Sequence, residues 1–325
     1  MRKSHIVAIP IFPNLQSLDA TGPGQVFGSA NQLLGHDAYR VVFVSSTAGP
    51  VKTTAGFEFV ARPLRLLPPK TVDTLIIPGG DESGIRGALT DKALMQWINA
   101  AARSAKRACS VCSGAFLFAA TGLLDGKTAA THWSATTNLQ NAFPKVKVDE
   151  HSIYVSDGKC WTSAGVTTGI DMALALLEED HGRDLAMDVA RQLVVYMRRP
   201  GHQTQFSTTL TAQSATDDRL AKLAVWMEDN LRQDLSVDAL AERMGMSPRT
   251  FHRYMHTELK SSPARFVESV RLNAAKRLLD TRTLDVSQIA QRAGFSGADH
   301  LIRAFGRRFG VTPHAYRQNH GPHTP

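Results

Sequence analysis

The sequence contains few cysteines and no long apolar run. Its three cysteines are an odd number, so they cannot all be paired in a disulfide framework. No stretch approaches the roughly 20 apolar residues that a membrane-spanning helix needs. The apolar run at residues 6–11 is short and contains Pro10, which does not fit a secretory signal. We therefore expect a protein of the reducing cytoplasm that makes no contact with a membrane and holds neither a metal nor a cofactor.

Most of the chain has no net positive charge. The chain also lacks a long low-complexity tract. Its length of 325 residues and its 43% hydrophobic content predict two domains with ordinary hydrophobic cores. The 242 residues before Arg243 carry 23 Lys and Arg against 24 Asp and Glu. From Arg243 to Pro325 there are 14 Lys and Arg against 5 Asp and Glu. The net charge of +8 therefore arises near the C-terminus, which is typical of a module that binds nucleic acid.

Residues 236–317 contain one pattern twice. Each copy has a small alanine, a glycine, an apolar anchor, a proline 12 residues after the anchor and a ring 15 residues after it: Ala241, Gly245, Phe251, Pro263 and Phe266, then Ala290, Gly294, Leu301, Pro313 and Tyr316. The alanine lets two helices approach, and the glycine allows the positive φ of a sharp turn. Ser247 is placed as an N-cap before Pro248. Each copy therefore predicts a helix-turn-helix.

The segment between the copies predicts a stiff helix over residues 263–279, because its apolar residues recur at helical spacing. Two units held by such a helix can present recognition helices to successive major-groove faces, roughly 34 Å apart.

This duplicated segment resembles the AraC/XylS family of transcription regulators. The matching motifs are Ile289-Ala290-x-x-x-Gly294-Phe295-Ser296 and Phe305-x-x-x-Phe309-Gly310-x-Thr312-Pro313-x-x-Tyr316-Arg317. The resemblance implies that six residues face double-stranded DNA: Arg249, His252, Arg253, Asp299, His300 and Arg303. Arginine pairs with guanine edges or with phosphate, so Arg253 and Arg303 are the leading candidates. The alternatives are ordinary surface charge for each arginine and a packed or capping imidazole for each histidine.

The first two hundred residues alternate between strand-like and helical patterns. Strands are predicted at 5–9, 39–45, 74–77 and 108–111, and helices near 24–34, 91–105, 165–179 and 185–196. This alternation predicts a flavodoxin-like α/β sandwich, a parallel sheet covered on both faces, with sites at the carboxyl ends of strands. We expect an α/β domain at 1–199, a polar linker at 200–216 and an all-α domain with two helix-turn-helix motifs at 217–320.

Two predicted strand ends carry candidate chemistry. Pro78-Gly79-Gly80 offers backbone N–H groups without side-chain obstruction, a candidate anion or oxyanion cradle. Cys112 falls where a strand turns into a helix, the geometry of a nucleophile elbow, and a helix N-terminus lowers the pKa of a thiol. The alternative for Cys112 is a small buried hydrophobe. Cys109 lies within the strand, so we expect no dithiol, and one cysteine pair is too few for zinc.

The same region resembles the PfpI-like branch of the class I glutamine amidotransferase superfamily, and the full layout resembles GlxA-type regulators. The matching motifs are Leu18-Asp19-x-x-Gly22-Pro23, Ile77-Pro78-Gly79-Gly80, Cys112-Ser113-Gly114, Thr121-Gly-Leu-Leu124-Asp125-Gly126-Lys-x-x-x-Thr131-His132-Trp133, Thr162-Ser-Ala-Gly165-x-x-x-Gly169-x-Asp171 and Arg198-Arg199-x-Gly201-x-Gln203-x-Gln205-Phe206. The resemblance implies a ligand site formed by Asp19, Gly79, Gly80, Cys112, Ser113 and His132. For His132 we favour a structural role beside Trp133.

Two functions stay open at this point. The first is a transcription regulator whose α/β domain senses a small metabolite and which acts on DNA as a homodimer. The second is a cysteine-dependent hydrolase or isonitrile hydratase-like enzyme, with Cys112 as nucleophile and Asp19 as acid. Peptidase-like members of the family carry a histidine directly after the nucleophile, where this chain has Ser113. We favour the regulator, because a fused DNA-binding module gives the α/β site another use.

Overall fold

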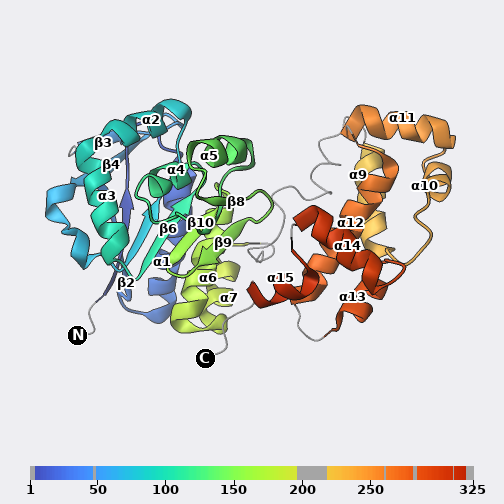
Figure 1. Cartoon of the computed structure of the whole chain (residues 1–325). Helices are drawn as coiled ribbons and strands as arrows, with labels where there is room; N and C mark the ends of the chain where they lie inside the picture. Colours follow the sequence, from blue (N-terminus) through green and yellow to red (C-terminus); the bar gives the residue numbers. More distant parts are fainter. Residues whose placement is uncertain are drawn as a thin grey trace. The chain divides into compact units, whose positions relative to one another are not determined.

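The chain divides into two compact units, residues Met1–His202 and Gln203–Pro325. The computed structural model, drawn in Figure 1, describes residues 4–46, 49–195, 218–259, 261–280, 284–309 and 311–319. The predicted linker at 200–216 lies outside these described residues, so its boundaries stay a prediction. None of the described helices is both long enough and apolar enough to cross a membrane.

The N-terminal unit is built on an eight-stranded sheet with the order β3-β4-β2-β1-β5-β6-β10-β9. The strands are β1 (His5–Pro10), β2 (Tyr39–Ser45), β3 (Gly49–Lys52), β4 (Glu58–Pro63), β5 (Thr74–Ile77), β6 (Arg107–Val111), β9 (Tyr154–Asp157) and β10 (Cys160–Ser163). The strands from β4 to β10 in this order pair in parallel, whereas β3 and β9 pair antiparallel at the two edges. Every residue of β5, β6 and β10 is buried, as expected for strands covered on both faces.

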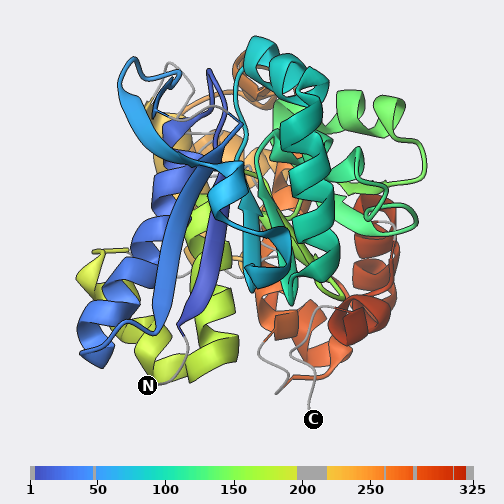
Figure 2. The same ribbon diagram turned by 90° about the vertical axis from the view of Figure 1, so that its left-hand side faces the viewer.

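Helices cover both faces of this sheet (Figures 1 and 2). On one face α1 (Ser17–Leu34), α6 (Thr168–His181) and α7 (Arg183–Gln192) contact one another. On the other face lie α2 (Glu82–Thr90), α3 (Lys92–Ser104) and α4 (Gly114–Ala119). A small sheet of β7 (Thr128–Ala130) and β8 (Lys147–Asp149) packs with α5 (Thr136–Ala142). The prediction of an α/β sandwich is confirmed.

Helix α1 begins at Ser17, well before the predicted start at residue 24. Glycine and proline are poor helix formers, yet the helix runs through Gly22-Pro23-Gly24. Close packing gives the glycines their role, because a Cβ on Gly22 would lie 3.0 Å from Cγ1 of Ile170. The earlier start places Asp19 in the first turn of α1.

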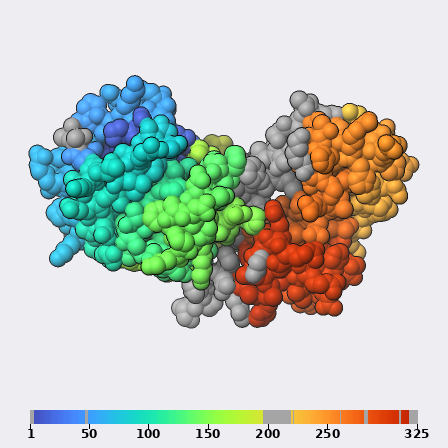
Figure 3. Space-filling model, turned by 45° about the horizontal axis from the view of Figure 1, so that its top comes forward, coloured from blue at the N-terminus to red at the C-terminus, as the bar shows by residue number. Residues whose placement is uncertain are grey.

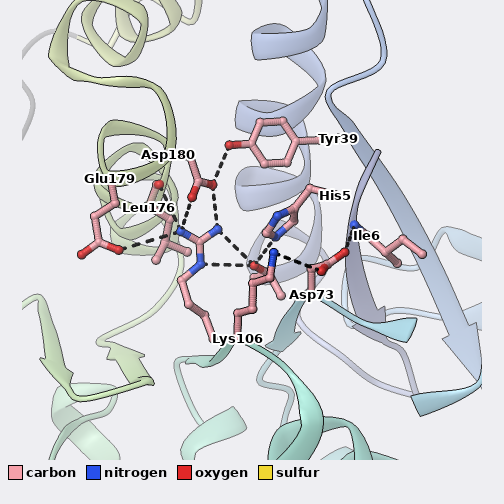
Figure 4. Close-up of polar contacts among 10 residues, drawn as sticks. His5, Ile6, Tyr39, Asp73, Lys106, Leu176, Glu179 and Asp180 are labelled. Carbon is pink, nitrogen blue, oxygen red and sulfur yellow. Dashed lines mark hydrogen bonds and ion pairs between the residues drawn. The ribbon is translucent and has the colours of Figure 1, made fainter. Parts of the chain in front are cut away.

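A buried polar cluster joins the last turn of α6 to the amino ends of the strands (Figure 4). The Arg107 side chain on β6, 10% exposed, donates from Nη1 and Nη2 to the two carboxylate oxygens of Asp180, at 2.9 and 2.7 Å. The Tyr39 hydroxyl donates to the same carboxylate at 2.7 Å. Arg107 also donates to Oγ1 of Thr74, which lies 2.8 Å from Nε2 of His5. The cluster thereby ties β1, β2, β5 and β6 to α6 at the amino ends of the strands. Cys112 lies at the opposite, carboxyl ends.

The C-terminal unit is helical and has two cores. Its helices are α9 (Asp218–Asp229), α10 (Val237–Arg243), α11 (Pro248–Leu259), α12 (Pro263–Asp280), α13 (Val286–Arg292), α14 (Ala298–Phe309) and α15 (Pro313–Asn319). Helix α12, the predicted connecting helix, belongs to both cores. Its first half contributes Phe266 and Val270 to one core, and its second half contributes Leu272 and Leu279 to the other. Leu231 packs against both cores.

Each core contains one helix-turn-helix, α10 with α11 and α13 with α14. The turn glycines, Gly245 and Gly294, have φ values of +65° and +79°, which confirms the predicted left-handed turns. Ser247 caps α11 as predicted, because its Oγ accepts from the Thr250 N–H at 3.3 Å. The second motif begins with a capping box at Asp285, which the sequence analysis missed.

Candidate functional site

Cys112 sits on a strained elbow between β6 and α4. Its φ is +57°, in the left-handed region that side chains with a Cβ rarely adopt, which confirms the predicted turn. Two glycines make room for this elbow. A Cβ on Gly165 would lie 2.4 Å from Cβ of Cys112, and one on Gly114 would lie 2.3 Å from the Ile77 carbonyl oxygen. The elbow therefore depends on a glycine in the loop after β10 and on another at the start of α4, where it packs against the end of β5.

Asp19 is fully buried beside Cys112. Its carboxylate accepts hydrogen bonds from the N–H of Gly79 at 3.0 Å and from the N–H of Val166 at 2.8 Å. Burial raises the pKa of Asp19 to about 6, although these two bonds and the Cys112 thiol act in the opposite direction. A proton can therefore be exchanged at this carboxyl near neutral pH.

The expectation of a low thiol pKa at Cys112 is wrong. Burial, and after it the negative charge of Asp19, raises the pKa of Cys112 to about 12. Hydrogen bonds from Ser113 lower the pKa but do not compensate. Helix α4 spans only Gly114–Ala119, so its N-terminus is too weak to reverse the effect of burial. At neutral pH the group is a thiol.

The expectation of an open anion cradle at Gly79 and Gly80 is also wrong, because both N–H groups are used within the domain. The Gly79 N–H donates to Asp19 at 3.0 Å, and the Gly80 N–H donates to Oγ of Ser113 at 3.0 Å. Ser113 Oγ in turn donates to the Gly80 carbonyl at 2.9 Å. A Cβ on Gly79 would lie 2.7 Å from Ser113 Oγ and 2.8 Å from the Asp19 carboxylate. These glycines therefore position Asp19 and Ser113 and leave no N–H for an anion.

His132 has the structural role that the sequence favoured. Its Nδ1 lies 2.8 Å from Oγ of Ser134, and its ring packs on Trp133 with centroids 5.3 Å apart. Burial lowers the pKa of His132. Its neighbour Thr131 reaches the site instead, donating from Oγ1 to the Cys112 carbonyl at 2.9 Å. Among the described residues, no histidine bonds to Cys112, and no three His, Cys, Asp or Glu side chains cluster as a metal site would require.

Sequence reasoning missed Val166, whose backbone N–H holds Asp19 from the loop after β10. A backbone donor leaves no mark in the residue type. The only signal was the neighbouring Gly165 in the quoted motif.

Helices α11 and α14 each present an exposed face, and both belong to segments that reach the surface in Figure 3. Arg249, His252 and Arg253 are exposed on α11, and Asp299 and Arg303 are exposed on α14. Within the described part of the chain, no carboxylate pairs with Arg253 or Arg303. These side chains are therefore available to a partner.

His300 differs from the other five predicted DNA-facing residues. It is half-buried, its Nδ1 lies 3.0 Å from Oγ of Ser296, and its ring packs edge-on against Phe295. This is the packed imidazole that was the alternative for His300. Ile302, which was not predicted to face DNA, is exposed on α14 together with Asp299 and Arg303.

Two family models match the chain. The DJ-1/PfpI family matches residues 5–179, more than half of the chain, and a helix-turn-helix domain matches residues 240–319. This chain belongs to the DJ-1/PfpI family. Its DJ-1/PfpI domain carries the Cys112 site, and the helix-turn-helix domain carries α11 and α14.

Three relatives are similar to this chain over much of its length. The HTH-type transcriptional regulator GbdR of Pseudomonas aeruginosa is 30% identical over 290 residues, covering 89% of this chain and 77% of the relative. The HTH-type transcriptional regulator GlxA of Rhizobium meliloti is 28% identical over 296 residues, covering 90% and 89%. An isonitrile hydratase of Pseudomonas putida is 33% identical over 216 residues, covering 66% and 87%. The chain has the fused architecture of DNA-binding transcription regulators, which confirms the resemblance to GlxA-type and AraC-type proteins.

Proposed function

We propose that this protein regulates transcription by binding double-stranded DNA through α11 and α14 and by sensing a small metabolite at the Cys112 site. The observation that carries the proposal is the pair of exposed helices mounted on the shared helix α12. We also propose that the protein acts in the cytoplasm, with double-stranded DNA as its partner. We further propose a homodimer, the commonest arrangement among soluble oligomers.

The proposed DNA contacts follow from chemistry and exposure. Arg253 and Arg303 occupy equivalent exposed positions, and a guanidinium can bond two acceptors of a guanine edge at once. Arg249, His252 and Asp299 lie on the same faces. His300 is proposed to hold the turn before α14 through Ser296, and its remaining ring nitrogen is its only route to DNA.

The test replaces the two arginines. Arg253→Ala and Arg303→Ala should each weaken specific binding by about 1–3 kcal/mol if they read bases. The measurement is fluorescence anisotropy on a duplex enriched from a random library by the full-length protein. Arg277→Ala is the matched control, because Arg277 lies on α12 and pairs with Glu228 at 3.7 Å. Unchanged affinity in both arginine variants would remove the assignment.

We propose that Asp19, Cys112 and Ser113 form the sensing site and that Gly79 and Gly80 position Asp19 and Ser113. His132, which bonds to Ser134 and packs on Trp133, keeps a structural role. The strength of this site as a sensor is that one carboxylate joins several elements. Asp19 lies on α1, accepts from the loop after β5 and from the loop after β10, and contacts the Cys112 elbow. A ligand that changes one of these bonds disturbs the others, and it alters DNA binding to the extent that it favours one state of the protein over another.

The second candidate function is a cysteine-dependent hydratase, favoured by the contact between Cys112 and Asp19 and by the isonitrile hydratase relative. A hydratase of this kind requires the Cys112 thiol to lose its proton when the sulfur attacks the substrate. The raised pKa of Cys112, about 12, opposes this loss. We propose that the site serves sensing and not turnover.

Cys112→Ala separates these two functions. Sensing is supported if a metabolite shifts the melting temperature of the wild type without being consumed, and if Cys112→Ala keeps operator binding but weakens that shift, since ligand occupancy stabilises the folded state. If wild-type protein hydrates an isonitrile and Cys112→Ala does not, the enzyme assignment replaces ours.

A further inference from the structure

The two recognition helices correspond position by position, with an offset of 50 residues. The buried residues of the two helices show this correspondence. Phe251 and its counterpart Leu301 are both fully buried, and so are Met255 and its counterpart Phe305. Because the same helical positions face the two cores, the same positions also face outward. Each exposed residue of α11 therefore has a defined counterpart on α14.

One of these counterparts differs in kind. Arg253 corresponds to Arg303, but the exposed His252 corresponds to Ile302. Ile302 is 37% exposed, and it lies next to Arg303 and three residues after Asp299 on the outer face. The apolar neighbours Leu301 and Phe305 are buried, so Ile302 is not part of the packed stripe of α14. A β-branched residue gains nothing in stability at such a position, where alanine or a charged residue is a better helix former.

We infer that Ile302 contacts the 5-methyl group of a thymine in the major groove, beside the base contacted by Arg303. The inference rests on the proposed DNA-binding function and adds a residue that determines specificity. The thymine methyl is the apolar feature of the major-groove edge, and an aliphatic side chain is its natural contact. When the Ile302 side chain and the thymine methyl group touch, both lose contact with water. This burial of apolar surface favours binding, whereas the Ile302 side chain stays exposed to water in the free protein.

The same comparison of α11 with α14 predicts the orientation of the protein on its DNA site. The first unit has the polar His252 where the second has Ile302, and Arg249 where the second has Asp299. An aspartate accepts from the cytosine amino group, whereas an arginine donates to guanine. The two half-sites therefore differ in sequence, and one protein chain binds its site in a single orientation.

The test removes only the methyl group. Full-length protein selects a duplex from a random library, and each thymine of the selected site is then replaced in turn by deoxyuridine. At one thymine the wild-type protein should lose about fourfold in affinity, the value of one buried methylene-sized group. Ile302→Ala should bind that thymine and deoxyuridine equally well. This variant should fold, because alanine is favourable in an exposed helix.

Val225→Ala is the matched control, because Val225 is 48% exposed on α9, outside the recognition helices. It should keep the wild-type response to deoxyuridine. If Ile302→Ala responds to deoxyuridine as the wild type does at every thymine, the inference falls. If the library yields a site that Arg303→Ala weakens while no thymine is coupled to Ile302, only this inference falls. A library that enriches no sequence overturns the proposed function as well.

Discussion

Burial chiefly determines the protonation of Asp19 and Cys112, and each group also shifts the pKa of the other. Burial acts on both groups, and the carboxylate keeps its two N–H donors while the thiol keeps its proton. The result at neutral pH is a neutral sulfur beside a carboxyl whose pKa lies at about 6. Such a pair can offer a ligand both a hydrogen-bond donor and an acceptor, which suits recognition better than nucleophilic attack.

Alkylation measures this state directly. Iodoacetamide should modify Cys112 at pH 7.5 roughly a thousandfold more slowly than a free cysteine, because only the thiolate reacts. Asp19→Asn should speed the reaction, since it removes the negative charge that raises the pKa of the thiol. The rate at each cysteine is read from modified peptides by mass spectrometry.

The control for this experiment is Cys109, which lies fully buried in β6 and should stay unmodified in both proteins. A Cys112 rate in the wild type equal to that of a free cysteine would contradict the assignment of a protonated thiol.

At the scale of elements, the two helix-turn-helix turns form a natural matched pair. Gly245 and Gly294 have similar positive φ values, but a Cβ on Gly245 would meet no atom within 4 Å. A Cβ on Gly294 would lie 2.0 Å from the Leu231 carbonyl oxygen. The second turn therefore needs glycine for space as well as for conformation.

Alanine substitution should separate these two requirements. Gly245→Ala should lower the free energy of unfolding by about 1 kcal/mol, the ordinary cost of a left-handed residue with a Cβ. Gly294→Ala should cost more, because the Leu231 backbone has to move. Urea unfolding of both variants provides the comparison, and equal losses would refute the steric role of Leu231.

The cluster around Arg107 should make stability depend on pH. Burial acts to raise the pKa of Asp180, but bonds from Arg107 and Tyr39 outweigh it and hold the pKa below its usual value. The stability contributed by Asp180 is therefore complete above about pH 4 and is lost as pH falls through the lowered pKa. Asp180→Asn should cost about 3 kcal/mol at pH 7, because it removes the two-oxygen partner of the buried Arg107 guanidinium and leaves only the longer pairing with Glu179 at 3.8 Å.

The difference in unfolding free energy between wild type and Asp180→Asn should shrink below pH 4. Glu82→Gln serves as control, because Glu82 pairs with Arg86 on an exposed surface of α2 and should change stability little. A difference that persists unchanged at pH 3 would show that ionisation of Asp180 does not stabilise the fold.

The sequence predicted regular elements better than it predicted contacts. Strands β2 and β5 were predicted with their observed ends, and α12 was predicted to within one residue, because apolar periodicity and flanking breakers mark them. The predicted start of α1 was late because Pro23 can lie inside a helix. Strands β3, β4, β9 and β10 of the main sheet were missed, since each is short and none contains a continuous apolar run.

The sequence predicted which residues form the candidate site, but it did not predict what each residue does there. Asp19, Cys112 and Ser113 were named from the sequence and lie in contact. The use of the Gly79 and Gly80 N–H groups could not be predicted, because it depends on which acceptors the fold places opposite them. The same limit applies to Ile302, which becomes visible only once the two helices are aligned by their buried residues.

For the whole molecule, the uneven charge predicts how binding responds to salt. The segment from Arg243 carries 14 Lys and Arg against 5 Asp and Glu. If the full-length protein neutralises about 6 phosphates, its affinity should fall by about a thousandfold between ~50 and ~200 mM salt. Arg253→Ala should leave the slope of log affinity against log salt unchanged if Arg253 reads a base, and reduce it by about 1 if Arg253 contacts a phosphate. A flat salt profile in the wild type would contradict the role of this segment.

The sharing of α12 by both cores has a consequence for promoters. Since Phe266 and Leu279 belong to one continuous helix yet anchor different cores, the described part of the C-terminal unit has no hinge within α12 that would let the two helix-turn-helix motifs move apart. Extra base pairs inserted between the two halves of a target site would have to be absorbed by twisting or bending the duplex. Tolerance to such insertions then depends on the DNA. A site with a stiff spacer should lose more affinity on insertion than a site with a flexible spacer.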